Sequence, residues 1–168
     1  MRSLLAGAPL LALAAVLQSA VLPHFRVLAG GGLDLTLVLA LGWTLAGDWQ
    51  GGAAWGFLGG LFLDLLSGGP LGLYTLAMVL MTYLASLTEG QFWRSHVLLP
   101  LAAALLGGLG FHAVVLAGLA IAGHALNWGE ALLGMVLPSV LLDLLAILPV
   151  YQAMRGLHAL LFPAPVKR

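Results

Sequence analysis

Two carboxylates and one imidazole stand inside long apolar stretches of the chain: Asp64, His112 and Asp143. An aspartate at the centre of a membrane span costs about 2.5–3.5 kcal/mol on insertion scales, so each such residue is a candidate for function. Carboxylates and imidazole are the groups that general acid–base catalysis, proton transfer or metal coordination use. The three residues lie on three different apolar segments, and their spacing does not require that they meet.

Motifs that would turn these residues into an enzyme site are absent from the sequence. The chain has no H-E-x-x-H metal motif, no G-x-S-x-G nucleophile elbow and no G-x-x-x-x-G-K-[ST] phosphate loop. It has no cysteine, which excludes disulfides, thiolate metal sites and a cysteine nucleophile. We therefore expect no catalytic residue, no metal and no cofactor. A membrane-embedded enzyme using Asp64, His112 and Asp143 is the weakest of the functions considered.

Asp64 comes just before a glycine-rich turn at residues 67–72, which contains Gly68, Gly69 and Pro70. A carboxylate at such a place can accept hydrogen bonds from several backbone amides of the turn at once. This structural role is the first interpretation of Asp64. The two others are a coordinating or proton-carrying carboxylate and part of an interface with a partner protein.

Asp143 and His112 lie deeper in their apolar segments than Asp64 does. Asp143 has no adjacent glycine turn, so it needs a partner from another helix, such as an amide, an imidazole, a hydroxyl or a protonated carboxyl. The sequence does not identify that partner. For His112, a neutral, hydrogen-bonded packing residue is the first interpretation, and a ligand or proton relay is the second.

Gly52, Gly56 and Gly60 recur at intervals of four, and Asp64 is next in the same series. Residues four apart lie on one face of a helix, so these glycines form a groove that lets another backbone approach closely. Two interpretations are open for this groove. It packs within the bundle, or it docks the helix of another protein.

The elements that must position these residues are membrane-spanning helices. Of the 168 residues, 62% are hydrophobic and 7% are charged, against about 45–50% and 25% in soluble domains. A span needs roughly 20 apolar residues, so the chain has room for about six. We predict an all-α, polytopic membrane bundle in a single integral membrane domain, residues 1–168. The predicted spans are residues 3–22, 33–46, 52–66, 71–88, 97–122 and 131–151.

The charged residues indicate an orientation. With a cytoplasmic N-terminus, Arg26 alone falls outside, so the positive-inside rule predicts that both termini are cytoplasmic. The alternative for the first segment is a cleaved signal peptide, with Gln18, Ser19 and Ala20 as its cleavage site. The formal net charge of zero excludes binding of nucleic acid through a basic surface.

The segment from Gly56 to Gly72, GFLGGLFLDLLSGGPLG, resembles the best-known segment of the rod-shape-determining MreD family. The final segment at residues 140–161, VLLDLLAILPVYQAMRGLHALL, is similar to the same family. So is the entry to the second span at Asp34, although Leu33 stands where that family commonly has proline.

The resemblance implies a non-enzymatic, multi-pass protein of the bacterial inner (cytoplasmic) membrane that helps to organise peptidoglycan synthesis. It implies binding to the single-span protein MreC, and through MreC a link to MreB and to the peptidoglycan synthases RodA and PBP2. In this hypothesis the glycine groove packs against the MreC helix, and Asp34, Asp64 or Asp143 fixes loops or partners.

The resemblance also implies a fold similar to the six-helix substrate-binding subunits of vitamin-uptake (ECF) transporters. The alternative function is therefore a small-solute, vitamin-like binding subunit of a transporter, which predicts a polar-lined cavity open to the outside. Its lid would be formed by residues 23–32 and 123–130, whose polar groups are His24, Arg26, His124, Asn127 and Glu130.

Overall fold

The computed structural model describes residues 2–21, 31–47, 49–88 and 97–162, and these residues form helices and the turns between them. The chain begins with α1 (Arg2–Val16), which continues as a π-helical turn, η1 (Leu17–Val21). Then come α2 (Leu35–Ala46), α3 (Trp49–Ser67), α4 (Leu73–Ser86) and α5 (Leu98–Ile121). The last helix runs without a break through α6 (Trp128–Glu130), η4 (Ala131–Val136) and α7 (Leu137–Leu161).

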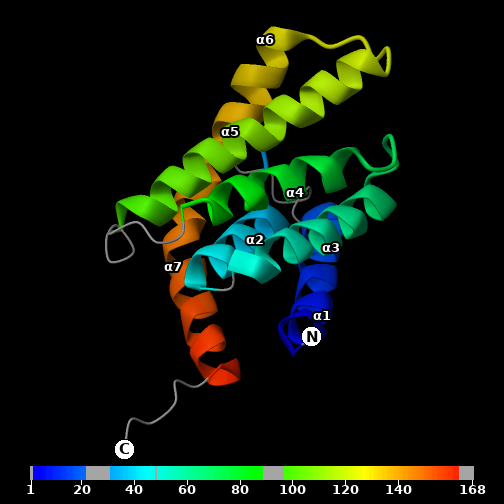
Figure 1. Cartoon of the computed structure of the whole chain (residues 1–168). Helices are drawn as coiled ribbons and strands as arrows, with labels where there is room; N and C mark the ends of the chain where they lie inside the picture. The colour runs from blue at the N-terminus through cyan, green and yellow to red at the C-terminus, as the bar shows by residue number, and fades with distance from the viewer. Residues whose placement is uncertain (1, 22–30, 48, 89–96, 163–168) are drawn as a thin grey trace, which may run out of the picture.

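Glycines that adopt positive φ lie just past the ends of α2 and α3. Gly47 has φ 129° and Gly68 has φ 67°, and at both positions a side chain would strain the backbone. The turn between α3 and α4 is short, so α4 returns antiparallel beside α3. Figure 1 shows the two helices side by side, with α5 next to α4.

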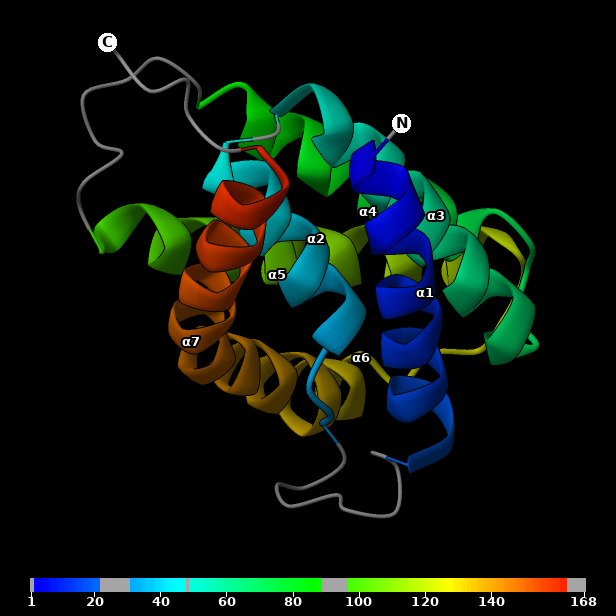
Figure 2. The same cartoon turned by 90° about the horizontal axis from the view of Figure 1, so that it is seen from below.

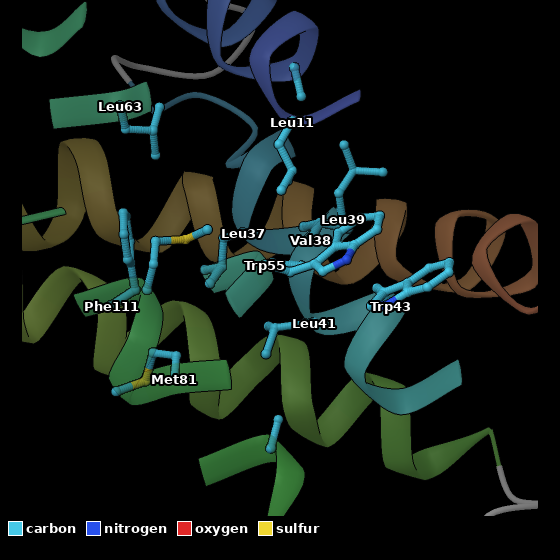
Figure 3. Close-up of a cluster of buried hydrophobic side chains, with 14 of the residues drawn as sticks. Leu11, Leu37, Val38, Leu39, Leu41, Trp43, Trp55, Leu63, Met81 and Phe111 are labelled. Carbon is cyan, nitrogen blue, oxygen red and sulfur yellow. The ribbon is translucent and has the colours of Figure 1, made fainter. Parts of the chain in front are cut away.

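The central element of the bundle is α2, which contacts α1, α3, α4, α5 and α7. Its residues 36–44 are all buried. Figure 3 shows the apolar core around it, where side chains from α1 to α5 meet. Within this core the indole rings of Trp43 and Trp55 are stacked, with centroids 4.4 Å apart and an interplanar angle of 6°. A helix buried on every side is hydrophobic all round, as the sequence of α2 is.

The outside of the bundle is apolar as well. In the most apolar stretch of α5, only 39% is buried. In the most apolar stretch of the helix at residues 128–161, the buried share is 33%. On the latter helix four leucines at intervals of four are each more than half exposed: Leu133, Leu137, Leu141 and Leu145. A core helix of a soluble protein would be mostly buried, so these surfaces need lipid or a partner to cover them.

Two helices, Leu98–Ile121 and Trp128–Leu161, are long and apolar enough to cross a membrane, judged by length and composition. Four further apolar helices are shorter, at Gly7–Val21, Leu35–Ala46, Gly51–Ser67 and Leu73–Ser86. The count of six spans therefore stays a prediction. Figures 1 and 2 show the beginning of α1 and the end of α7 at the same end of the molecule, and the entry to α2 at the opposite end.

Candidate functional site: a polar cavity at the entry to α2

Asp64 joins the end of α3 to the start of α4. Its side chain is buried, and its Oδ1 accepts the backbone N–H of Tyr74 at 2.9 Å. Its Oδ2 accepts the N–H of Thr75 at 3.0 Å and the hydroxyl of the same residue. These amides belong to the second and third residues of α4, which a helix cannot pair internally and which an N-cap side chain normally satisfies. The N-cap position holds Gly72, which has no side chain, so Asp64 supplies the acceptor from the preceding helix.

The amides that Asp64 binds are thus those of the first turn of α4. Within the predicted turn, the N–H of Gly69 donates to the hydroxyl of Ser67 at 3.3 Å, and Gly68 supplies the positive φ described above. Pro70 accepts a backbone hydrogen bond from Leu73 at 3.4 Å. The turn residues therefore shape the connection, and the carboxylate stabilises the helix that follows it.

We expect Asp64→Ala to lower the free energy of unfolding by about 2–3 kcal/mol, because it leaves two helix-terminal amides and the Thr75 hydroxyl without their acceptor. Asp64→Asn keeps one acceptor oxygen and should lose about half as much. Thermal unfolding in detergent measures both, with the exposed Glu130→Ala as a control that changes little. Equal stability of Asp64→Ala and the wild type would refute the capping role.

The glycine face of α3 is filled by helices of the same chain. A Cβ built on Gly60 would lie 2.8 Å from the backbone nitrogen of Thr75 in α4, and one on Gly56 would lie 2.9 Å from the carbonyl oxygen of Met78. A Cβ built on Gly52 would overlap the side chain of Thr44 in α2. Of the two interpretations of the groove, these contacts favour internal packing. A partner helix has no room between α3 and α4.

Asp34, His112 and Asp143 meet at the end of the molecule where α2 begins. The backbone N–H of Asp34 donates to Oδ1 of Asp143 at 2.9 Å. Oδ2 of Asp34 lies 3.5 Å from Nε2 of His112, and Oδ1 of Asp34 accepts the side-chain amide of Gln18 at 3.1 Å. All three candidate residues are buried, and Asp143 is fully so. The partner of Asp143 that the sequence could not identify is therefore a backbone amide.

Side chains from both ends of the sequence hold the entry to α2 in place. Gln18 on η1 accepts the backbone N–H of Thr36, the second residue of α2, at 3.0 Å. From α7, the hydroxyl of Ser139 accepts the N–H of Gly32 at 3.1 Å. Ser139 was not predicted from the sequence, and Gln18 was named only as part of the alternative cleavage site. The signal that could have identified Gln18 is a polar amide within an apolar helix.

The contacts of His112 indicate which of its ring nitrogens carries hydrogen. Its Nδ1 lies 3.0 Å from the carbonyl oxygen of Gly108, and since a carbonyl only accepts, Nδ1 carries hydrogen. In a neutral ring, Nε2 then has only a lone pair, and it faces the carboxyl oxygen of Asp34. The arrangement is favourable when one proton lies on either group. Oδ2 of Asp34 and Oδ2 of Asp143 have no hydrogen-bond partner in the described part of the chain.

Asp34 and His112 line a cavity of about 420 Å³, whereas Asp143 is not part of its lining. Small-molecule sites typically measure about 300–1,000 Å³, so the cavity is large enough for a ligand. Its polar lining comes from Gln18, Ser19, Asp34, Ser67, Tyr74, His112 and Ser139. Its apolar lining comes mainly from Leu33, Leu63, Leu66, Phe111, Val115 and Met135.

Asp64 is not part of this cavity lining, and its side-chain hydrogen bonds go to α4. The structure thus brings His112 and Asp143 together with Asp34, while Asp64 serves the neighbouring helix. Among the predicted lid segments, Gly31 and Gly32 line the cavity, residues 23–30 lie outside the described residues, and none of residues 123–130 lines it. Within the described residues, no group of three or more His, Asp or Glu is placed to hold a metal ion.

An all-helical bundle with an apolar exterior and a polar cluster at one end is the architecture of a membrane-associated helical protein. The chain matches the family of the rod shape-determining protein MreD over residues 1–160, and it belongs to that family. The family takes part in determining rod shape, is associated with the membrane and is not a known enzyme family. No match was found among curated proteins or among solved structures.

Proposed function

We propose that the protein is a non-enzymatic scaffold of the bacterial cytoplasmic membrane that binds the transmembrane helix of MreC. Through MreC it is linked to MreB, RodA and PBP2, and so to peptidoglycan synthesis during elongation. The membership in the MreD family over residues 1–160 carries this proposal. The apolar exterior of α5 and α7 supports it, because helical surfaces of this kind act on other proteins by packing against them.

The MreC helix needs a docking surface other than the glycine face of α3, which α4 occupies. A hollow of about 200 Å³ between α4 and α5 offers one. Its lining is apolar and includes the small residues Ala85, Ala102, Ala103 and Gly107. Small residues let two helix backbones approach closely, and this is the main source of packing energy between helices in lipid. We place the MreC helix along this hollow.

Co-purification of MreC with variants of α5 tests this placement. Ala102 is exposed and lines the hollow, so Ala102→Phe should fill it and reduce the amount of co-purified MreC at least about tenfold without unfolding the protein. The matched control is Leu141→Phe, which adds an aromatic ring to the exposed face of α7 and should retain MreC. Full retention of MreC by a folded Ala102→Phe variant would exclude the hollow, and no co-purification with the wild type would exclude the scaffold.

The second candidate function is the binding subunit for a small solute, similar to the ECF transporter subunits. The cavity at the entry to α2 is the observation that favours it. Figure 2 shows the entry to α2 at the end of the molecule opposite the beginning of α1. Residues 31–34 at this entry line the cavity, so the predicted orientation turns the cavity to the outside of the cell. This is the side from which an uptake protein takes its solute.

A further inference from the structure

We infer that Asp34 and His112 hold one proton between them, that this proton stabilises the entry to α2, and that the entry loosens as the pH outside the cell rises. The basis is a carboxyl oxygen and a ring nitrogen that lie 3.5 Å apart, on two residues that line the cavity. This pH-sensitive switch does not depend on whether the cavity takes a solute.

Without a proton, the two side chains would present acceptors to each other. Nδ1 of His112 donates to the carbonyl oxygen of Gly108, so a neutral ring has only a lone pair at Nε2. An ionised Asp34 has only lone pairs as well. Both side chains are buried, and two acceptors at this distance repel each other in surroundings of low polarity. One proton removes the repulsion, either as a carboxylic acid that faces the ring or as an imidazolium that faces the carboxylate.

The groups from η1 and α7 that face Asp34 favour retention of this proton. The side-chain amide of Gln18 on η1 donates to Oδ1 and leaves Oδ2 to the imidazole. Asp143 on α7 accepts the backbone N–H of Asp34 and interacts electrostatically with Asp34 and His112. Any negative charge on Asp143 makes a second charge on Asp34 more costly, because like charges repel.

The groups from α3 and α4 supply no compensating positive charge. Tyr74 on α4 lines the same cavity and interacts electrostatically with Asp34 and Asp64. The carboxylate of Asp64 on α3 is used by the first turn of α4. The described lining of the cavity includes no lysine or arginine. The proton shared with His112 is therefore the group that neutralises Asp34.

The cavity connects this pair with water at one end of the molecule. Asp34 and His112 both line it, and 13% of the Asp34 side chain is exposed. Oδ2 of Asp34 itself is buried, so the proton is held away from water and equilibrates with it through the cavity. In the predicted orientation this water is outside the cell, so the pair responds to the external pH.

Loss of the proton acts on the start of the central helix. Asp34 directly precedes α2, and repulsion from His112 moves it away from α5. The unfolded chain loses the proton of this histidine near pH 6.5, about its ordinary pKa, whereas the folded pair retains one proton above that pH. The folded state then binds more protons than the unfolded state, so the free energy of unfolding falls as the pH rises.

Thermal unfolding of the full chain in detergent, from about pH 7 to about pH 9, tests the shared proton. We expect the wild-type midpoint to fall by about 3 °C or more over this range. Asp34→Asn should change by less than about 1 °C, because its amide N–H is placed to donate to Nε2 of His112 at every pH and its oxygen still accepts from Gln18. The matched control, Asp143→Asn, should keep most of the wild-type dependence.

A thiol at the start of α2 reports the loosening itself. Thr36 is fully buried and its hydroxyl has no hydrogen-bond partner in the described part of the chain, so Thr36→Cys should fold. Thiols react faster at high pH wherever they lie, so the labelling rate is divided by that of the same thiol in an Asp34→Asn background. We expect this ratio to rise at least about threefold from about pH 7 to about pH 9.

Three results would overturn the switch. The first is a wild-type midpoint that depends on pH no more than that of Asp34→Asn. The second is a dependence that disappears in Asp143→Asn, or in a His24→Gln variant outside the described residues, but persists in Asp34→Asn, since the proton then lies elsewhere. The third is a labelling ratio that stays constant with pH, since the proton then does not control the entry to α2.

Discussion

Gly60→Ala is expected to lower the free energy of unfolding by about 3 kcal/mol or more, and the unfolding midpoint by about 6–12 °C. The added Cβ would overlap Cα of Thr75 and lie 2.8 Å from its nitrogen and 2.9 Å from the carbonyl oxygen of Tyr74. All three atoms belong to the backbone of α4, which cannot rotate away as a side chain can. The two helices must separate, and the hydrogen bonds of Asp64 to the same turn of α4 are weakened with them.

Gly156→Ala is the matched control for this prediction. Gly156 is helical and exposed on α7, and a Cβ built on it meets no atom within 4 Å. The same substitution should therefore stabilise the protein there by about 0.5–1 kcal/mol, through the lower helix propensity of glycine. Thermal unfolding in detergent compares the two variants. If both had the same stability, α3 and α4 would not pack as described. A folded Gly60→Ala variant that keeps its stability but no longer binds MreC would mean that MreC docks on the glycine face of α3.

The glycine series shows how far a sequence pattern reaches. Spacing by four placed Gly52, Gly56 and Gly60 on one helix face and predicted that a backbone approaches it. The spacing does not identify the helix to which this backbone belongs. The turn after Ser67 identifies it, since a connection this short returns the next helix antiparallel to the same face. Combining the groove with the length of the turn would have identified α4 as its occupant.

The helix ends show a different limit. Apolar composition predicted a last segment at residues 131–151, whereas the helix runs from Trp128 to Leu161. Polar residues such as Gln152 and Arg155 end an apolar run, yet they do not end a helix, because both have good helix propensity. The helix ends where Phe162 leaves the helical region, with φ −129° and ψ 68°, as a residue before proline is expected to do.

The polar cluster is the part of the site that local patterns could not predict. Asp34 and Asp143 are 109 residues apart, and no helical or turn spacing couples them. Sequence reasoning identified Asp143 and His112 because an ionisable group in an apolar segment is costly without a partner, whereas Asp34 was a candidate only through the family resemblance. It grouped His112 and Asp143 with Asp64, whose partners lie on α4. Only the packing of α5 and α7 around α2 decides which carboxylates meet.

Asp143→Ala is expected to have the second large effect, a loss of about 3–5 kcal/mol of unfolding free energy. Asp143 is fully buried, and its Oδ1 accepts the N–H of Asp34 directly before α2, the helix that every other long helix contacts. Alanine leaves that amide buried and unpaired and opens a void beside Gly108, which Oδ2 of Asp143 faces. Water reaches this bond less easily than the bonds of Asp64 at the α3–α4 turn, so the loss should exceed that of Asp64→Ala.

Asp143→Asn separates the acceptor from the charge. The asparagine oxygen can still accept the N–H of Asp34, and the variant replaces an unpaired buried carboxyl oxygen by a neutral amide. Its stability should therefore equal that of the wild type within about 1 kcal/mol. Thermal unfolding of both variants in the same detergent gives the comparison. An asparagine variant as unstable as the alanine variant would mean that the negative charge, and not the hydrogen bond to Asp34, holds the entry of α2 in place.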